Sequence, residues 1–163
     1  MPTTADVPAA STALPLPPAL GFMRSLWLLN HSLERLSSRM ERHFGVTAQQ
    51  RLMIRCIGTS PGLTSGQLSN MLRVDPGTVS AALKRLEAKG LVDRSKDKDD
   101  RRRVLLKLTA RGRLLDQPMD GTVEHAVDSL LASRRTSDVV STVSVIEQLA
   151  ALLGNELSDE RGD

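Results

Sequence analysis

The sequence has 163 residues, of which 40% are hydrophobic and 25% are charged, and its net charge at pH 7 is +3. This length supports one core, with or without an appended helical element, and the ordinary composition excludes a mostly disordered or fibrous chain. Phe22, Trp27 and Phe44 are the whole set of Phe, Trp and Tyr residues. A core built instead on Leu, Val, Ile, Met and Ala favours helices.

Several common kinds of site lack the residues they need. Cys56 is the single cysteine, which excludes an intrachain disulfide, and no Cys/His cluster has the spacing of a structural zinc site. A secretory signal begins with basic residues, whereas the first twenty residues contain no Lys or Arg. The sequence contains no run of about 18 apolar residues, so we predict that no segment spans a membrane. We therefore expect a cytoplasmic protein with no metal, no cofactor and no membrane partner.

The chain should begin with a tail and a long helix. Residues 1–17 are rich in proline and have no periodicity, so we predict a disordered tail. A helix is predicted from Pro18 to Gly45, because apolar residues recur there at steps of three and four. The stripe consists of Phe22, Met23, Leu26, Leu29, Leu33, Leu36, Met40 and Phe44. It is longer than a small lobe can cover, so part of it should meet a partner helix.

Two capping boxes predict the next two helices. Thr47 with Gln50 and Thr64 with Gln67 have the S/T-x-x-E/Q spacing, in which each side chain satisfies an otherwise free backbone amide. The first of these helices should end near Ile57. The second is short and should bury Leu68, Met71 and Leu72.

A further helix follows after a short turn. Asp75 is a good N-cap, and Pro76 suits the first helical position, where its missing amide costs nothing. This helix should end at Lys89 and Gly90. Two short capped helices joined by a tight turn are typical of a helix-turn-helix.

Two strands with a charged loop between them are predicted next. Leu91 and Val92 begin an extended segment, and residues 104–108 alternate between apolar and polar faces. The loop, DKDDRRR at residues 97–103, makes the tip of a hairpin that projects as a wing. Residues 84–113 include twelve basic and five acidic residues, so this segment has a net charge of +7 and the rest of the chain has a net charge of −4. This pattern indicates a surface for a polyanion, with a solvated charged face as the alternative.

The chain should end in helices. Thr109 is a good N-cap, and Met119, Val123, Val127 and Leu130 mark a long helix in which Pro118 and Gly121 predict a kink or a late start. A last helix is predicted from about Ser137 to Leu153 on the stripe Val139, Val143, Ile146, Leu149 and Leu153. A polar tail should follow Leu157.

The segment LVDRSKDKDDRRRVLLKLTARG (91–112) resembles the wing of the MarR family of winged-helix transcription regulators, with its D-x-R and L-T-x-x-G motifs. DPGTVSAALKRLEAKG (75–90) resembles the family's recognition helix, and LTSGQLSNMLRV (63–74) the helix before it. The resemblance implies a mainly α (α+β) fold: a winged helix-turn-helix with a small β-hairpin wing, flanked by N- and C-terminal helices that form a helical dimerisation lobe. The implied DNA-binding domain is 47–109, the dimerisation lobe is 18–46 with 110–157, and the tails are 1–17 and 158–163.

The resemblance also implies a homodimer that binds double-stranded DNA at a pseudo-palindromic operator. The half-site centres would lie about one helical turn, ~34 Å, apart. Asp100 would orient Arg102, and Arg102 would enter the minor groove, although Arg101, Arg102 and Arg103 are consecutive and the inserting guanidinium is left open. The other predicted DNA contacts are base readout by Pro76, Gly77, Thr78, Ser80 and Ala81, and phosphate contacts by Thr64, Ser65, Arg73, Lys84, Arg85 and Lys98.

The predicted function is that of a transcription regulator, most simply a repressor, and several additional or alternative functions are also possible on the sequence. A small amphipathic effector could bind among Trp27, His31, Met53 and Cys56, unless these residues are simply core. Cys56 could sense oxidants, but a buried small hydrophobe is the favoured interpretation. The pair His31 and Glu34 falls far short of a metal site. No nucleophile elbow or phosphate loop indicates an enzyme, and a non-specific architectural DNA-binding protein or a helical module for an acidic protein are the remaining alternatives.

Overall fold

The structure is a computed structural model that describes residues 16–97, 100 and 103–159, with side chains to residue 155. The chain divides into two units, Met1–Arg35 and Leu36–Asp163, which we describe separately. In chain order the elements are α1 (Pro18–Phe44), α2 (Ala48–Thr59), α3 (Ser65–Leu72), α4 (Pro76–Ala88), β1 (Val92–Lys96), β2 (Val104–Leu108), α5 (Ala110–Leu115), α6 (Val123–Leu131) and α7 (Thr136–Asp159). The mainly helical winged-helix class predicted from the sequence is confirmed.

Helix α1 has the predicted bounds. It begins at Pro18 and is followed by Gly45, whose φ of +74° is a left-handed conformation that glycine adopts without strain. Along the predicted stripe Met40 is buried, whereas Phe22 and Met23 are exposed. The predicted disordered tail lies, for residues 1–15, outside the described part of the chain.

The predicted caps begin α2, α3 and α4. The Gln50 amide donates to Thr47 Oγ1 at 3.2 Å, and the Gln67 amide donates to Thr64 Oγ1 at 3.2 Å, each in a complete capping box. Asp75 caps α4, with Pro76 in the first turn. Both capping-box helices and the helix after the turn are therefore confirmed, with α2 ending two residues later than Ile57. In α3, Leu68 is buried as predicted and Leu72 is partly buried, whereas the prediction that Met71 is buried is wrong, because its side chain is exposed.

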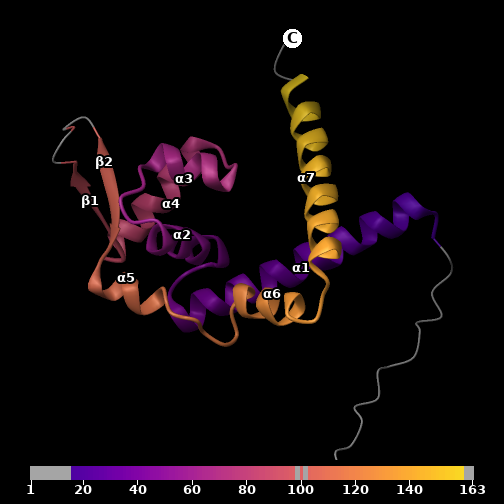
Figure 1. The fold of residues 1–163 in the computed structure, drawn as a ribbon, viewed down its shortest axis with the longest axis horizontal. Coiled ribbons are helices and arrows are strands. Elements are labelled where there is room, and N and C mark those ends of the chain that lie inside the picture. Colours follow the sequence, from indigo (N-terminus) through magenta and orange to yellow (C-terminus); the bar gives the residue numbers. More distant parts are fainter. Residues whose placement is uncertain (1–15, 98–99, 101–102, 160–163) are drawn as a thin grey trace, which may run out of the picture. The chain divides into compact units, whose positions relative to one another are not determined.

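The two strands form the predicted hairpin. Strands β1 and β2 pair antiparallel, with Val92 opposite Leu108 and Lys96 opposite Val104. The Leu106 amide also donates to the Leu63 carbonyl at 2.7 Å, which ties β2 to the segment before α3. Figure 1 shows the hairpin beside the group of α2, α3 and α4.

The described core lies where these three helices meet the hairpin. Its fully buried members come from α2, α3, α4, β1, β2 and the segment just before α2, and they are aliphatic or sulfur-containing rather than aromatic, as the composition predicts. They include Val46, Met53, Ile54, Ile57, Leu68, Val79, Leu83, Leu86, Val92 and Leu106. The core therefore belongs to the winged module and sets its geometry.

The segment after β2 differs from the single long helix that the sequence predicted. Helix α5 ends at Leu115, and α6 begins only at Val123, capped by Thr122. Pro118 lies in the connection, and Gly121 there has a φ of +73°, so of the two predicted alternatives, a kink and a late start, the late start is confirmed. Helix α7 continues to Asp159, past the predicted end near Leu153.

Helices α6 and α7 bury almost nothing in a single chain. None of the described residues of α6 is buried, and Val127, Leu130, Val143 and Ile146 are exposed. The stretch Thr136–Asn155 is long and apolar enough, by length and composition, to cross a membrane, with a mean hydropathy of 1.2. Asp138 and Glu147 interrupt it, which is why the sequence shows no uninterrupted apolar run. The apolar face of α7 is therefore exposed in the single chain.

Candidate nucleic-acid interface

Helix α4 presents a small polar face with an apolar face behind it. Val79, Ala82, Leu83 and Leu86 are buried against the core. The residues predicted to contact DNA from this helix, Pro76, Gly77, Thr78, Ser80, Ala81, Lys84 and Arg85, are all exposed. The helix can therefore lie against a ligand without disturbing the core.

Asp75 fixes the beginning of this helix. Its Oδ1 accepts hydrogen bonds from the Gly77 amide at 2.8 Å and from the Thr78 amide at 3.1 Å. A carboxylate at this end also interacts favourably with the helix dipole. The start of α4 is thus held before any ligand arrives.

Helix α3 places the next predicted contacts. Thr64 is the N-cap and Ser65 is the first helical residue, both partly buried. Arg73 ends the helix in a left-handed conformation, with φ of +51°, and is highly exposed. Its guanidinium lies 3.1 Å from the Glu147 carboxylate of α7. This pair is exposed and therefore weak, so Arg73 can exchange Glu147 for another anion.

The base of the wing loop is closed by backbone hydrogen bonds. The Asp97 amide donates to the Arg103 carbonyl at 3.0 Å, and the Arg103 amide donates to the Asp100 carbonyl at 2.9 Å. The Arg103 guanidinium lies 3.9 Å from the Asp97 carboxylate, so it is directed back to the stem of the loop. The predictions for Lys98, Arg101 and Arg102, including the bracing of Arg102 by Asp100, lie outside the described residues.

An ion pair that the sequence did not reveal holds the wing beside α4. Arg94 of β1 binds Glu87 near the end of α4 through its Nε. A charged residue seven positions from another, across a turn, has no sequence signal of its own. The contact fixes the direction of the hairpin relative to the predicted recognition helix.

The L-T-x-x-G motif forms the joint below the wing. Thr109 accepts a hydrogen bond from the Gly112 amide at 2.9 Å and donates its hydroxyl to the Gly90 carbonyl at 2.8 Å. The Thr109 amide donates to the Leu91 carbonyl at 3.1 Å. A Cβ at Gly112 would lie 2.0 Å from that carbonyl oxygen, so no side chain fits there. The motif thus places α5 directly against the start of the hairpin.

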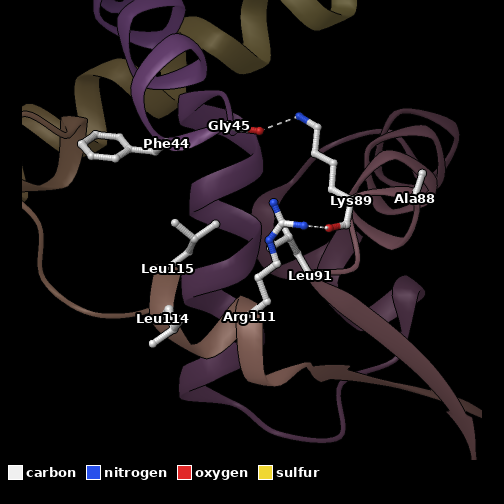
Figure 2. Close-up of a pocket in the computed structure, with 8 residues that line it drawn as sticks. All are labelled: Phe44, Gly45, Ala88, Lys89, Leu91, Arg111, Leu114 and Leu115. Atoms are coloured by element: carbon white, nitrogen blue, oxygen red, sulfur yellow. Dashed lines mark hydrogen bonds between the residues drawn. The ribbon is translucent and has the colours of Figure 1, made fainter.

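A cavity of about 480 Å³ lies next to this joint. Its cations are Lys89 and Arg111, and its apolar walls come from Phe44, Leu91, Leu114 and Leu115. Figure 2 shows Lys89 reaching the Gly45 carbonyl, at 2.8 Å, and Arg111 reaching the Lys89 carbonyl, at 3.1 Å. The cavity therefore combines two positive charges with an apolar surface.

The four residues predicted to bind an effector do not line this cavity. Trp27 and His31 are exposed and belong to the unit Met1–Arg35. Met53 is fully buried in the core, and Cys56 packs against it. Burial raises the pKa of the Cys56 thiol, which keeps it protonated and poorly nucleophilic. Within the described residues, no group of three or more His, Cys, Asp or Glu could hold a metal ion.

The sequence also did not reveal Arg51. This arginine of α2 is fully buried and binds the connection between α5 and α6. A signal was present: no Asp or Glu lies between Glu41 and Asp75, so a buried arginine there has to find distant partners.

Comparison with known proteins agrees with this geometry. Residues 46–104, from the end of α1 to the start of β2, match the sequence model of the MarR family. Over these residues the chain is similar to the MarR family. Over 100 residues it is 36% identical to the HTH-type transcriptional regulator TtmR of Methylorubrum extorquens, a match that covers 61% of this chain and 51%, about half, of that protein.

Two further proteins extend the comparison. An HTH-type transcriptional repressor of Mycobacterium tuberculosis is 32% identical over 93 residues, or 57% of this chain and 66% of that protein. The crystal structure of a mutant of MarR from Escherichia coli complexed with operator DNA is similar with a TM-score of 0.60 and 26% identity, covering 81% of this chain and 94% of that one.

Proposed function

We propose that this chain is a sequence-specific, double-stranded DNA-binding transcription regulator of the cytoplasm, most simply a repressor. The observation that carries the proposal is the exposed polar face of α4, with the wing fixed beside it by the Arg94 and Glu87 pair. The segment from residue 84 to residue 113 adds a net charge of +7 around these elements. The complex of a related protein with operator DNA and the repressor among the relatives support the proposal.

The exposed side chains indicate how DNA would be read. Those at the start of α4 are small and uncharged, so direct base readout is modest, and groove shape and phosphate contacts carry more of the specificity. Lys84 and Arg85 lie about two turns after the first residue of the helix, where they suit phosphates. The wing residues Asp100, Arg101, Arg102 and Arg103 are proposed for the flanking minor groove.

We propose that the chain acts as a homodimer. The exposed apolar faces of α6 and α7 need cover, and a second copy supplies the same faces. Asp138 and Glu147 within α7 favour such a protein partner over lipid, because carboxylates inside a bilayer are costly. In this proposal 18–46 and 110–157 form the dimerisation lobe and 47–109 the DNA-binding domain.

An effector is proposed at the cavity between Lys89 and Arg111. Two cations beside four apolar side chains suit a small amphipathic anion. The sequence-based alternative, a site among Trp27, His31, Met53 and Cys56, stays a prediction. No catalytic role is proposed, and the relatives are named as regulators rather than enzymes.

The test is selection of binding sites from random duplex DNA, followed by titration of the selected operator and a scrambled duplex. We expect an inverted repeat with half-site centres ~34 Å apart and a clear preference for the operator. If six to ten phosphates are contacted, affinity should fall about 10³ to 10⁵-fold between 50 and 200 mM salt. A specificity ratio near one would instead show a non-specific architectural protein, and a flat salt response would remove DNA as the ligand of the basic segment.

A further inference from the structure

Arg51 is a fully buried arginine that no part of the DNA-contact surface uses. It lies on α2, next to Gln50 of the capping box, and none of its side chain is exposed. Its guanidinium donates to the carbonyl oxygens of Leu115 and Gln117, the second at 2.7 Å, and its Nε binds the Glu124 carboxylate of α6. One side chain of the winged module therefore holds both the end of α5 and the first turn of α6.

The partners of Arg51 are groups that need a donor. Leu115 is the last residue of α5, where helix carbonyls have no partner within the helix. Gln117 follows in the connection, outside any helix. A guanidinium carries five N–H donors in a fixed plane, so it can satisfy two carbonyls and a carboxylate together, which a lysine cannot do with the same geometry.

Among the described residues, α2 also meets this connection at Asp116, which lies against Gly58 and Arg55. No described residue of α6 is buried, so apolar packing does not hold the helix within one chain. One turn after Arg51 on α2, the Arg55 guanidinium donates to Asp116 at 2.8 Å, but this pair is partly exposed. The Thr122 hydroxyl donates to the Met119 carbonyl at 2.6 Å, which stabilises the turn internally without attaching it to α2. The buried contacts of the connection with α2 therefore centre on Arg51.

We infer that Arg51 is a positioning residue that sets how the winged module stands relative to the dimerising helices, and thereby which spacing of DNA half-sites the protein accepts. The inference rests on the proposed function. Arg51 is remote from α4 and the wing. It would control specificity without changing any direct contact with DNA. In a two-fold dimer, any change of angle between α2 and α6 occurs twice and moves the two recognition helices relative to each other.

The experiment uses the full-length protein and the operator found by selection, with duplexes in which one or two base pairs are inserted or removed between the half-sites. Arg51→Met keeps an unbranched side chain and removes every donor. Arg51→Lys keeps the charge. Arg134→Met makes the same change at an exposed arginine after α6 and serves as the matched control.

We expect Arg51→Met to bind the selected operator about tenfold more weakly and to discriminate much less among the spacings. Arg51→Lys should recover part of both properties, and Arg134→Met should match the parent. Amide hydrogen exchange in residues 116–122 should be faster in Arg51→Met only. Glu124→Gln should shift both properties in the same direction by less, and it replaces Arg51→Met as the deciding variant if the latter fails to form a folded dimer.

The outcomes separate the two proposals. If the parent protein binds the selected operator no better than a scrambled duplex, the proposed function is refuted, whatever the Arg51 variants do. A parent that binds specifically, with an Arg51→Met variant that keeps the parent's ranking of spacings, overturns the inference, whether affinity is unchanged or uniformly reduced, because a merely stabilising residue would act equally on every duplex.

Discussion

Replacing Gly112 with alanine tests the joint between the wing and α5. In an ordinary helix this change stabilises by about 1 kcal/mol, because alanine loses less backbone entropy. Here the new Cβ would lie 2.0 Å from the Leu91 carbonyl oxygen and 3.5 Å from Leu108 Cβ. Because unstrained heavy atoms of this kind meet at about 3.5 Å, the helix or the strand has to move by more than an ångström.

The free-energy cost of this movement depends on the atoms that surround the new Cβ. The obstructing atom belongs to the backbone and accepts the Thr109 amide at 3.1 Å, so it cannot rotate away as a side chain would. Overpacking of this kind costs about 1–3 kcal/mol, and lengthening the hydrogen bond costs about 1 kcal/mol more. After subtracting the helical gain, we expect Gly112→Ala to lower the free energy of unfolding by about 1–3 kcal/mol.

The assay is urea unfolding followed by far-UV circular dichroism at fixed protein concentration. Gly66→Ala in α3 is the matched control, because nothing lies within 4 Å of its new Cβ, and it should leave stability unchanged or raise it by up to about 1 kcal/mol. The reasoning is refuted if Gly112→Ala proves as stable as the parent, or if both variants change stability equally.

Three further predictions concern DNA binding, stability and reactivity. Arg102→Ala should weaken operator binding in a titration while size-exclusion chromatography still shows the dimer; unchanged affinity would defeat the assignment of this residue to the minor groove. Asp75→Ala removes the acceptor of two amides and should cost about 0.5–2 kcal/mol in urea unfolding, and an unaltered midpoint would show that the cap contributes nothing. Cys56→Ser and the parent should keep the same DNA affinity after peroxide treatment, because burial raises the pKa of the thiol; a loss of affinity in the parent alone would establish redox sensing.

Local signals predicted the beginnings of the helices well. The Thr47 and Thr64 capping boxes and the Asp75 cap act through residues two or three positions away, so their chemistry is complete within the sequence. The end of α7 was less predictable. A glycine such as Gly154 costs a helix only about 1 kcal/mol, and the helix continues through it to Asp159.

Contacts between distant segments could not be predicted. Arg51 meets Glu124 across 73 positions, and the sequence shows only that no acid lies near it. The apolar spacing of residues 119–130 fits a continuous helix, yet Gly121 takes a left-handed turn and α6 starts later. For the candidate site, the sequence favoured the face of α4 that proves exposed, but not the ion pair of Arg94 with Glu87 that aims the wing.

The Asp75 carboxylate has a consequence for what the tip of α4 can approach. Free amides at a helix start attract phosphate, but here two of them are already occupied by a tethered anion. That anion repels the sugar–phosphate strand electrostatically, whereas the uncharged edges of bases meet no such barrier. In the proposed complex, the first turn of α4 therefore approaches base edges within a groove more easily than it approaches phosphates. Contacts with the phosphates must then come from cations elsewhere on the winged module.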